Sequence, residues 1–293
     1  MVRLFLLISF ALLQGLTSQA QAAPPSLVVK PAAEIWYSEQ FIAHSAIVGR
    51  DFLIQVAKPP LQDGAEKAPA IYILDGNSSF GLAANIMQGS VAGAIMAPAY
   101  VIGVGYPSQT RKDWQALRSR DLTFVPVAPT EPADHELTGE AMKFQRFLTE
   151  ELRPLIEARY PIDRALLAGH SYGGLFAAHV LLNDPRAFDG YLIGSPSLWA
   201  EPALLEKAAT FRAPNRVPVF IAVGAKEAQQ NDAVYHMVRN MTALAARLAD
   251  HPSNLDIKAW VVPEENHTTV RPAFLARAMP FVLPPPEAGK PAH

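Results

Sequence analysis

The clearest candidate for chemistry in this chain is a serine flanked by glycines, in Gly169-His170-Ser171-Tyr172-Gly173-Gly174. The pattern G-x-S-x-G is typical of a sharp turn between a strand and a helix, which exposes the serine oxygen and crowds the backbone so closely that glycine is needed. The helix that begins there directs its N–H groups and its positive end toward the reacting atoms. Ser171 is therefore a candidate nucleophile, and a structural Gly-Ser-Gly turn without chemistry is the alternative.

A serine hydroxyl is a weak nucleophile and needs a neighbouring base. In hydrolases with this turn, the acid and the histidine follow the serine along the chain. Among the eight histidines, His267 fits best, because it follows the last apolar strand pattern and precedes the last helical one. A loop at the carboxyl end of such a strand is where ligands bind in open α/β sheets. We therefore expect His267 to be the general base.

The acid should follow the penultimate strand pattern, where it can accept the ring N–H of the base and stabilise the imidazolium. Glu227 lies just beyond that strand, in Gly224-Ala225-Lys226-Glu227, and is the preferred candidate. Asp232 is a rival a few residues later. A Ser-His pair without a close carboxylate is a further alternative.

Acyl transfer also needs two N–H donors for the developing oxyanion. The residue after the nucleophile, Tyr172, should supply one from its backbone. The turn Leu74-Asp75-Gly76-Asn77 follows an early strand pattern, and its glycine allows a close backbone approach, so the N–H of Asn77 is the second candidate. An ordinary Asp-Gly turn is the alternative.

The elements that must position these residues alternate along the chain. Short runs without a polar face, typical of strands buried on both sides, lie at 70–74, 100–104, 165–168, 191–193, 217–223 and 257–262. Helical patterns lie between and after them, at 136–159, 172–182, 232–248 and 272–281. This alternation predicts an α/β fold, a mostly parallel central sheet with helices on both faces. We also expect an antiparallel strand at 46–56 and a long loop at 106–134 over the active end of the sheet.

The amino terminus has the pattern of a secretory signal peptide: Arg3, then the apolar run 4–13, then small residues before a cleavage site after Ala22. This predicts a signal peptide at 1–22 and a single domain at 23–293, periplasmic or secreted, without stable membrane insertion after cleavage. The chain has no cysteine, which excludes disulfides and thiolate chemistry. No basic stripe for nucleic acid, metal-ligand cluster or cofactor motif is evident, so we expect no cofactor and no metal.

Taken together, these motifs resemble the esterase D-like esterases of the α/β-hydrolase superfamily, and most closely the periplasmic esterases of catecholate siderophores, which cleave enterobactin-type trilactones. The matching segments run in family order from residue 71 to residue 267: Tyr72 to Asn77, Gly103-Val104-Gly105-Tyr106-Pro107, Arg120-Asp121-Leu122-Thr123, Gly169 to Gly174, Ser195-Pro196-Ser197-Leu198-Trp199, Gly224 to Glu227 and the His267 loop. The resemblance implies the α/β-hydrolase fold and a small-molecule ester substrate. One departure concerns the substrate pocket: Phe124 follows Thr123, where the family usually continues directly to proline.

Basic residues cluster around Trp114, and three of them, Arg111, Arg118 and Arg120, are candidate contacts for an anionic ferric catecholate. A solvated basic loop is the alternative. Trp199 is a further candidate for lining the pocket, with core packing as its alternative. We expect hydrolysis of an ester through an acyl-enzyme; a general carboxylesterase, a feruloyl-type esterase and an acyltransferase remain alternatives.

Overall fold

The computed structural model describes residues 35–60, 67–108, 110–127, 138–229, 235–250 and 252–285. All of them lie in the second of two units, Glu34–His293, into which the contacts divide the chain. The expected signal peptide, residues 1–22, lies outside the described residues.

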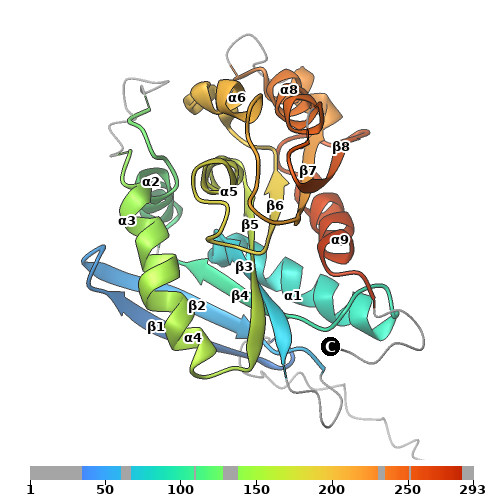
Figure 1. The fold of residues 1–293 in the computed structure, drawn as a ribbon. Helices are drawn as coiled ribbons and strands as arrows, with labels where there is room; N and C mark the ends of the chain where they lie inside the picture. The colour runs from blue at the N-terminus through green and yellow to red at the C-terminus, as the bar shows by residue number, and fades with distance from the viewer. Residues whose placement is uncertain are drawn as a thin grey trace, which may run out of the picture. The chain divides into compact units, whose positions relative to one another are not determined.

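The described strands form one sheet of eight, in the order β1-β2-β4-β3-β5-β6-β7-β8 (Figure 1). β2 runs antiparallel to both of its neighbours, and the strands from β4 through β8 pair in parallel. The α/β architecture is confirmed, and each of the six apolar runs lies in a strand. Five of these strands are largely buried, but β8, at the edge of the sheet, buries only Val262. The strands are β1 (Ser38–Ser45), β2 (Arg50–Ala57), β3 (Ala68–Leu74), β4 (Tyr100–Gly105), β5 (Ile162–His170), β6 (Gly190–Gly194), β7 (Val217–Gly224) and β8 (Leu255–Val262).

The amino-terminal strand differs from the expectation. A single strand was predicted at 46–56, but the structure has a hairpin, in which β1 and β2 pair from Ser45 opposite Arg50 to Ser38 opposite Ala57. Residues 46–49 form the turn, and Gly49 takes a positive φ of 77°. That conformation favours glycine, which identifies Gly49 as a turn residue rather than a strand residue.

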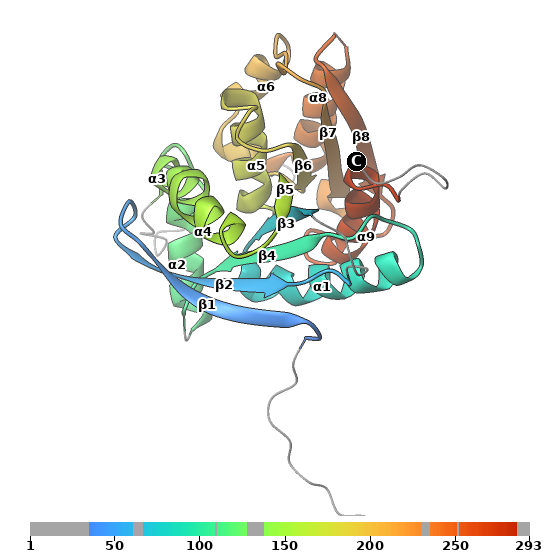
Figure 2. The same cartoon turned by 60° about the horizontal axis from the view of Figure 1, so that its bottom comes forward.

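Helices cover both faces of the sheet (Figures 1 and 2). α1 (Gly76–Ala92) and α9 (Val270–Val282) share one apolar core with one face. The opposite face packs against α5 (Tyr172–Asn183) and α8 (Met237–Ala249), with shorter helices beside them. The shorter helices are α3 (Ala141–Arg146), the π-helix η1 (Phe147–Leu152), α4 (Arg153–Glu157), η2 (Leu198–Ala200), α6 (Ala203–Ala208) and η3 (Ala225–Ala228).

The segment predicted as a long loop at 106–134 contains a helix, α2 (Arg111–Asp121). Thr110 caps it, because its Oγ1 accepts a hydrogen bond from the N–H of Asp113 at 3.1 Å. The helix lacks an apolar stripe, and one of the residues it buries is an arginine, Arg118. The prediction was therefore wrong for a physical reason: ion pairing, which hydrophobic periodicity does not detect, holds this helix in place. Residues 109 and 128–134 of the predicted loop lie outside the described residues.

Candidate active site

Ser171 lies between the end of β5 and the start of α5, with φ of 62° and ψ of −120°. Its N–H donates to the carbonyl of Gly194 at 3.0 Å, which ties the turn to the end of β6. A Cβ at Gly169 would lie 2.1 Å from the Gly173 oxygen, and one at Gly174 would lie 2.4 Å from the Gly194 oxygen. At Gly173 the nearest atom would be 3.5 Å away, an ordinary contact. The crowding expected from G-x-S-x-G therefore falls on Gly169 and Gly174.

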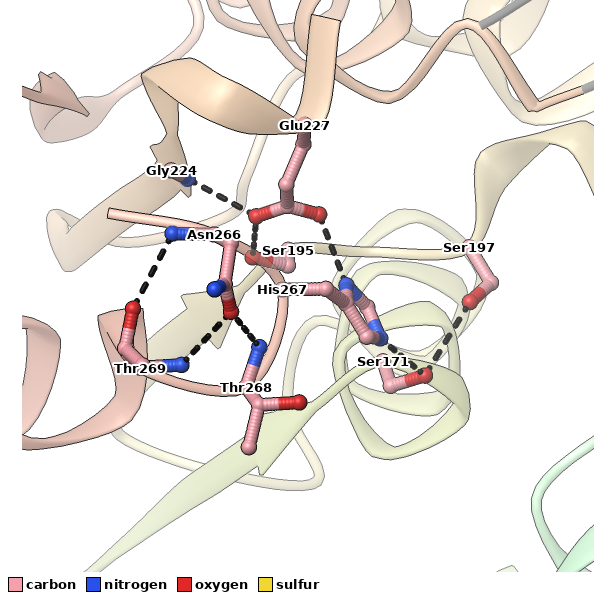
Figure 3. A network of polar contacts seen from close by, with 9 residues as sticks. All are labelled: Ser171, Ser195, Ser197, Gly224, Glu227, Asn266, His267, Thr268 and Thr269. Carbon is pink, nitrogen blue, oxygen red and sulfur yellow. Dashed lines mark hydrogen bonds and ion pairs between the residues drawn. The ribbon is translucent and has the colours of Figure 1, made fainter. Parts of the chain in front are cut away.

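The structure brings the three predicted catalytic side chains together (Figure 3). His267 Nε2 lies 3.0 Å from Ser171 Oγ, and His267 Nδ1 lies 2.7 Å from Glu227 Oε2. Each residue follows a different strand, β5, β7 or β8, and carboxyl ends of parallel strands meet at one edge of a sheet. This is the arrangement by which a carboxylate orients an imidazole toward a hydroxyl. The rival acid, Asp232, lies outside the described residues.

Glu227 is 1% exposed, and its carboxylate has hydrogen-bond donors on both oxygens. Oε1 accepts from Ser195 Oγ at 2.7 Å and from the N–H of Gly224 at 2.8 Å, while Oε2 faces His267. A buried carboxylate requires such partners. The sequence analysis gave Ser195 no role, although the motif Ser195 to Trp199 was one of the segments that carried the resemblance.

The His267 loop is held in place by its own hydrogen bonds and by the end of β7. Asn266 Oδ1 accepts from the N–H groups of Thr268 and Thr269, at 2.9 and 3.1 Å (Figure 3). The N–H of Lys226 donates to the Glu265 carbonyl at 2.9 Å. These contacts fix the loop beside Glu227, and Asn266 is a positioning residue that the sequence analysis missed.

His170 is a second histidine at the site. Its ring centroid lies 4.7 Å from that of His267, and its Nε2 is buried without a partner among the described residues. Burial first, and the charge of His267 second, hold the pKa of His170 well below the ordinary value of 6.5. His170 is therefore a neutral neighbour of the base.

A cavity of about 440 Å³ opens at Ser171, within the usual range for small-molecule sites. Two of the four predicted substrate contacts, Arg118 and Trp199, line it. Arg111 is exposed at the start of α2, and Arg120 lies 3.8 Å from Asp121; neither is among the lining residues. The lining consists of Gln115, Arg118, Ser171, Tyr172, Ser197, Trp199, Glu227, Tyr235, Met237, His267 and Thr268.

Arg118 is the only arginine in this lining, and its charge is compensated. Its Nε and one terminal nitrogen donate to the two oxygens of Asp75, each at 2.7 Å. The guanidinium lies 5.1 Å from the Trp114 ring and 5.5 Å from the Tyr172 ring. Burial alone lowers the pKa of Arg118, but Asp75 outweighs it and raises the pKa above the ordinary value. The predicted basic cluster thus supplies one arginine to the cavity wall, and the charge of this arginine is balanced by Asp75. It does not form a free cationic patch.

The two predicted oxyanion donors lie in different places. Tyr172 follows Ser171 directly, in the first turn of α5. Asn77 lies against the end of β4: its side-chain amide donates to the Tyr106 carbonyl and accepts from the Tyr106 N–H, both at 2.8 Å. A Cβ at Gly105 would lie 3.0 Å from the Asn77 nitrogen. Asn77 thus lies in the first turn of α1, with its backbone nitrogen beside the end of β4. Its role as second oxyanion donor stays a prediction.

Phe124, the residue that departs from the family pattern, packs on α5. Its ring stacks on His179 with centroids 3.4 Å apart and lies 5.3 Å from Phe176. It is not among the residues that line the cavity. The departure therefore changes packing behind the site.

We predict that Asp75→Asn lowers the free energy of unfolding by about 3–5 kcal/mol, because it leaves the buried guanidinium of Arg118 without its counter-charge. Urea denaturation followed by circular dichroism measures this change. Glu150→Gln is the control, since it breaks the pair with Arg146 on the surface and should leave the urea midpoint unmoved. Equal midpoints for both variants would show that the Asp75–Arg118 pair does not stabilise the fold.

Residues 45–257 match the Esterase family model, described as "Putative esterase". The chain is 35% identical over 252 residues to the ferri-bacillibactin esterase BesA of Bacillus subtilis, across 80% of this chain and 86% of that protein. The chain belongs to the esterase family.

Solved structures agree with this membership. The BES protein from Bacillus cereus has a TM-score of 0.76 at 30% identity, over 88% of this chain and 99% of its own. The siderophore hydrolase EstB from Aspergillus nidulans has a TM-score of 0.73 at 28% identity, over 88% of this chain and 98% of its own. The predicted resemblance is confirmed, and this esterase is a serine hydrolase that acts on ester bonds.

The described residues contain neither a membrane-spanning helix nor a metal-binding cluster. No helix there is both long and apolar enough to cross a bilayer. No group of three or more histidine, aspartate or glutamate side chains in that part of the chain is arranged to hold a metal ion.

Proposed function

We propose that this esterase hydrolyses its substrate through an acyl-enzyme on Ser171, and that the substrate is the ester backbone of a siderophore. The contact between His267 Nε2 and Ser171 Oγ, at 3.0 Å, carries the mechanistic part of the proposal. The names of the relatives support the substrate: BesA is a ferri-bacillibactin esterase, and EstB is a siderophore hydrolase.

In the proposed reaction, His267 Nε2 takes the proton of Ser171 as Oγ attacks the ester carbonyl. Glu227 Oε2, 2.7 Å from His267 Nδ1, stabilises the imidazolium that forms. The imidazolium then protonates the leaving alcohol, and the acyl group stays on Oγ. Water then attacks the acyl-enzyme as His267 takes its proton. The imidazolium returns this proton to Ser171 Oγ as the bond between Oγ and the acyl carbon breaks, which releases the acid and restores Ser171.

The tetrahedral intermediates carry a negative oxygen that N–H donors must stabilise. We assign one donor to the backbone of Tyr172, at the positive end of α5. The second comes from the start of α1, after β3, where Asn77 is the predicted residue. This segment lies beside the nucleophile turn, because the Asp75 side chain would lie 3.6 Å from a Cβ at Gly173.

The cavity wall favours an aromatic ester. Trp199 lies between two tyrosines, with ring centroids 4.8 Å from Tyr235 and 6.0 Å from Tyr172. Such rings stack on flat aromatic groups such as catechol. Arg118, paired with Asp75, lies over the same Tyr172 ring. The guanidinium N–H groups that do not bond Asp75 can donate to substrate oxygens.

Incubation with a catecholate trilactone, metal-free and ferric in separate reactions, tests the substrate. We expect a linear trimer that is heavier than the trilactone by one water, and a linear dimer and monomer where further esters are cleaved, all detected by mass spectrometry. Acetyl and feruloyl esters, and an alcohol acceptor added to the reaction, represent the alternatives. Brisk turnover of simple esters with an intact trilactone would reject the siderophore substrate, and transfer to the alcohol would indicate an acyltransferase.

We also propose that the protein is exported, on the evidence of the pattern in residues 1–22. Expression of the full chain in a Gram-negative host should yield a periplasmic or secreted protein that begins at Ala23. Mass spectrometry of the purified protein measures this, and an uncleaved cytoplasmic chain would contradict it.

A further inference from the structure

Ser195 directly follows β6, in the motif Ser195-Pro196-Ser197, and its side chain reaches the far end of the catalytic group. It is fully buried, and its Oγ donates to Glu227 Oε1 at 2.7 Å (Figure 3). Its backbone takes a positive φ of 38°, which is rare for a residue with a side chain. The N–H of Ser195 donates to the Ala222 carbonyl in β7 at 2.7 Å, which helps to hold it in this conformation.

We propose that Ser195 is a positioning residue for the esterase reaction, whose hydroxyl holds the Glu227 carboxylate in the plane that points Oε2 at His267. This inference rests on the proposed function, since it assigns Ser195 a role through Glu227. The segment Ser195 to Trp199 is one of those that carry the family resemblance, and this inference assigns a role to its first residue.

The need for such a residue follows from the mobility of a carboxylate. Rotation about the last bond of a glutamate side chain has broad, shallow minima, so packing alone defines it poorly. Here two donors from different elements meet on Oε1: the N–H of Gly224 at the end of β7 and the hydroxyl of Ser195 after β6. Together they fix the carboxylate plane and compensate the charge on the oxygen that His267 does not touch. Without Ser195, one donor remains and the buried Oε1 loses a charge-assisted hydrogen bond.

The same turn also contacts the nucleophile. The N–H of Ser197 donates to the Ser171 carbonyl at 3.2 Å, and Ser197 Oγ lies 3.5 Å from Ser171 Oγ. The residue before the turn, Gly194, accepts the N–H of Ser171. One short segment after β6 therefore contacts both Ser171 and Glu227. Strained backbone of this kind persists where surrounding contacts determine it, often at functional sites.

Ser195→Ala tests the proposal on p-nitrophenyl butyrate. We expect kcat to fall about 10- to 100-fold, the range for a hydrogen bond to a charged group. The KM should stay within about twofold, because Ser195 is not among the residues that line the cavity. Ser253→Ala is the matched control: it removes a buried hydroxyl that bonds the Leu248 carbonyl, away from the cavity lining, and should leave both constants unchanged. Thermal unfolding is measured for each variant, and Ser195→Gly, which relieves the positive φ, serves if the alanine variant does not fold.

A double-mutant cycle separates a role through Glu227 from a general effect on structure. In a Glu227→Ala background, adding Ser195→Ala should lower kcat by less than about twofold, because the group that it positions is gone. The same 10- to 100-fold loss in both backgrounds would overturn the proposal, and so would a loss confined to KM. Full activity of Glu227→Ala would remove the triad acid and this inference with it. An inactive Ser171→Ala variant would show that the serine mechanism itself still stands.

Discussion

Ser171→Ala should lower kcat for p-nitrophenyl butyrate by about 10⁴- to 10⁶-fold, with KM changed by less than about threefold. The hydroxyl is the atom that forms the acyl-enzyme, whereas the cavity that binds the ester keeps its other lining residues. Residual turnover comes from the oxyanion donors and from binding, which remain intact. Steady-state kinetics on purified variants measure the effect.

His267→Ala should cause a loss of similar size, and the double variant with Ser171→Ala should lose almost nothing further, because the two residues act as one unit. His179→Ala is the matched control. His179 also pairs with a glutamate, Glu201 at 2.9 Å, but lies outside the cavity lining, so kcat should stay within about threefold. Losses that multiply in the double variant, or an active Ser171→Ala variant, would refute the nucleophile and base assigned here.

The sequence predicted the catalytic geometry because the three residues share one feature: each lies within a few residues of the carboxyl end of a parallel strand. Parallel strands bring such positions to one edge of the sheet, so order along the chain becomes proximity in space. Ser171 was predicted from the G-x-S-x-G motif, and Glu227 and His267 from their places after the last two strand patterns. Their mutual hydrogen bonds agree with this prediction. The prediction needed the motif, the strand patterns and the order in which hydrolases with this turn place their acid and histidine.

Side-chain contacts between residues far apart in the chain had no comparable signal in the sequence. Ser195 donates to Glu227 from a backbone at positive φ, and Asp75 pairs with Arg118 across 43 residues of chain. Arg118 was predicted to be a cation available to an anionic substrate, but it is 6% exposed and paired with Asp75, on a helix without an apolar stripe. Periodicity and local spacing say nothing about such pairs. The sequence therefore overestimated the free positive charge at the site.

The predicted helix at 136–159 shows a similar limit in the fold. The apolar residues of this segment, at 137, 141, 144, 148, 152 and 155–156, follow a regular α-helical period, which would place Leu155 and Ile156 on one face. The structure inserts the π-helix η1 between α3 and α4, and Leu155 is 59% exposed while Ile156 is buried. A π-helical segment shifts the register of everything after it. Since no residue type marks that shift, the faces of the second half were only partly predictable.

Gly169→Ala should disrupt the turn that presents Ser171. A Cβ at this position would lie 2.1 Å from the oxygen and 2.3 Å from the carbonyl carbon of Gly173, and both are backbone atoms that no rotamer change can move. Relief requires the start of α5 to shift relative to β5, which we expect to cost at least about 3 kcal/mol of unfolding free energy. Ser171 would move with the turn, and a displacement of about 1 Å in a catalytic group lowers the rate about 100-fold or more.

Gly173→Ala is the matched control. The motif G-x-S-x-G contains both glycines, but in the structure only a Cβ at Gly169 would overlap backbone atoms. A Cβ at Gly173 would contact Leu74 at 3.5 Å and Asp75 at 3.6 Å, without overlap. Gly173 lies in α5, where alanine is a better helix former, so stability should hold or rise by up to about 1 kcal/mol. Thermal and urea unfolding of the two variants measure the difference. Equal destabilisation would mean that conformational freedom, and not the overlap with the Gly173 carbonyl, is what the turn requires of its glycines.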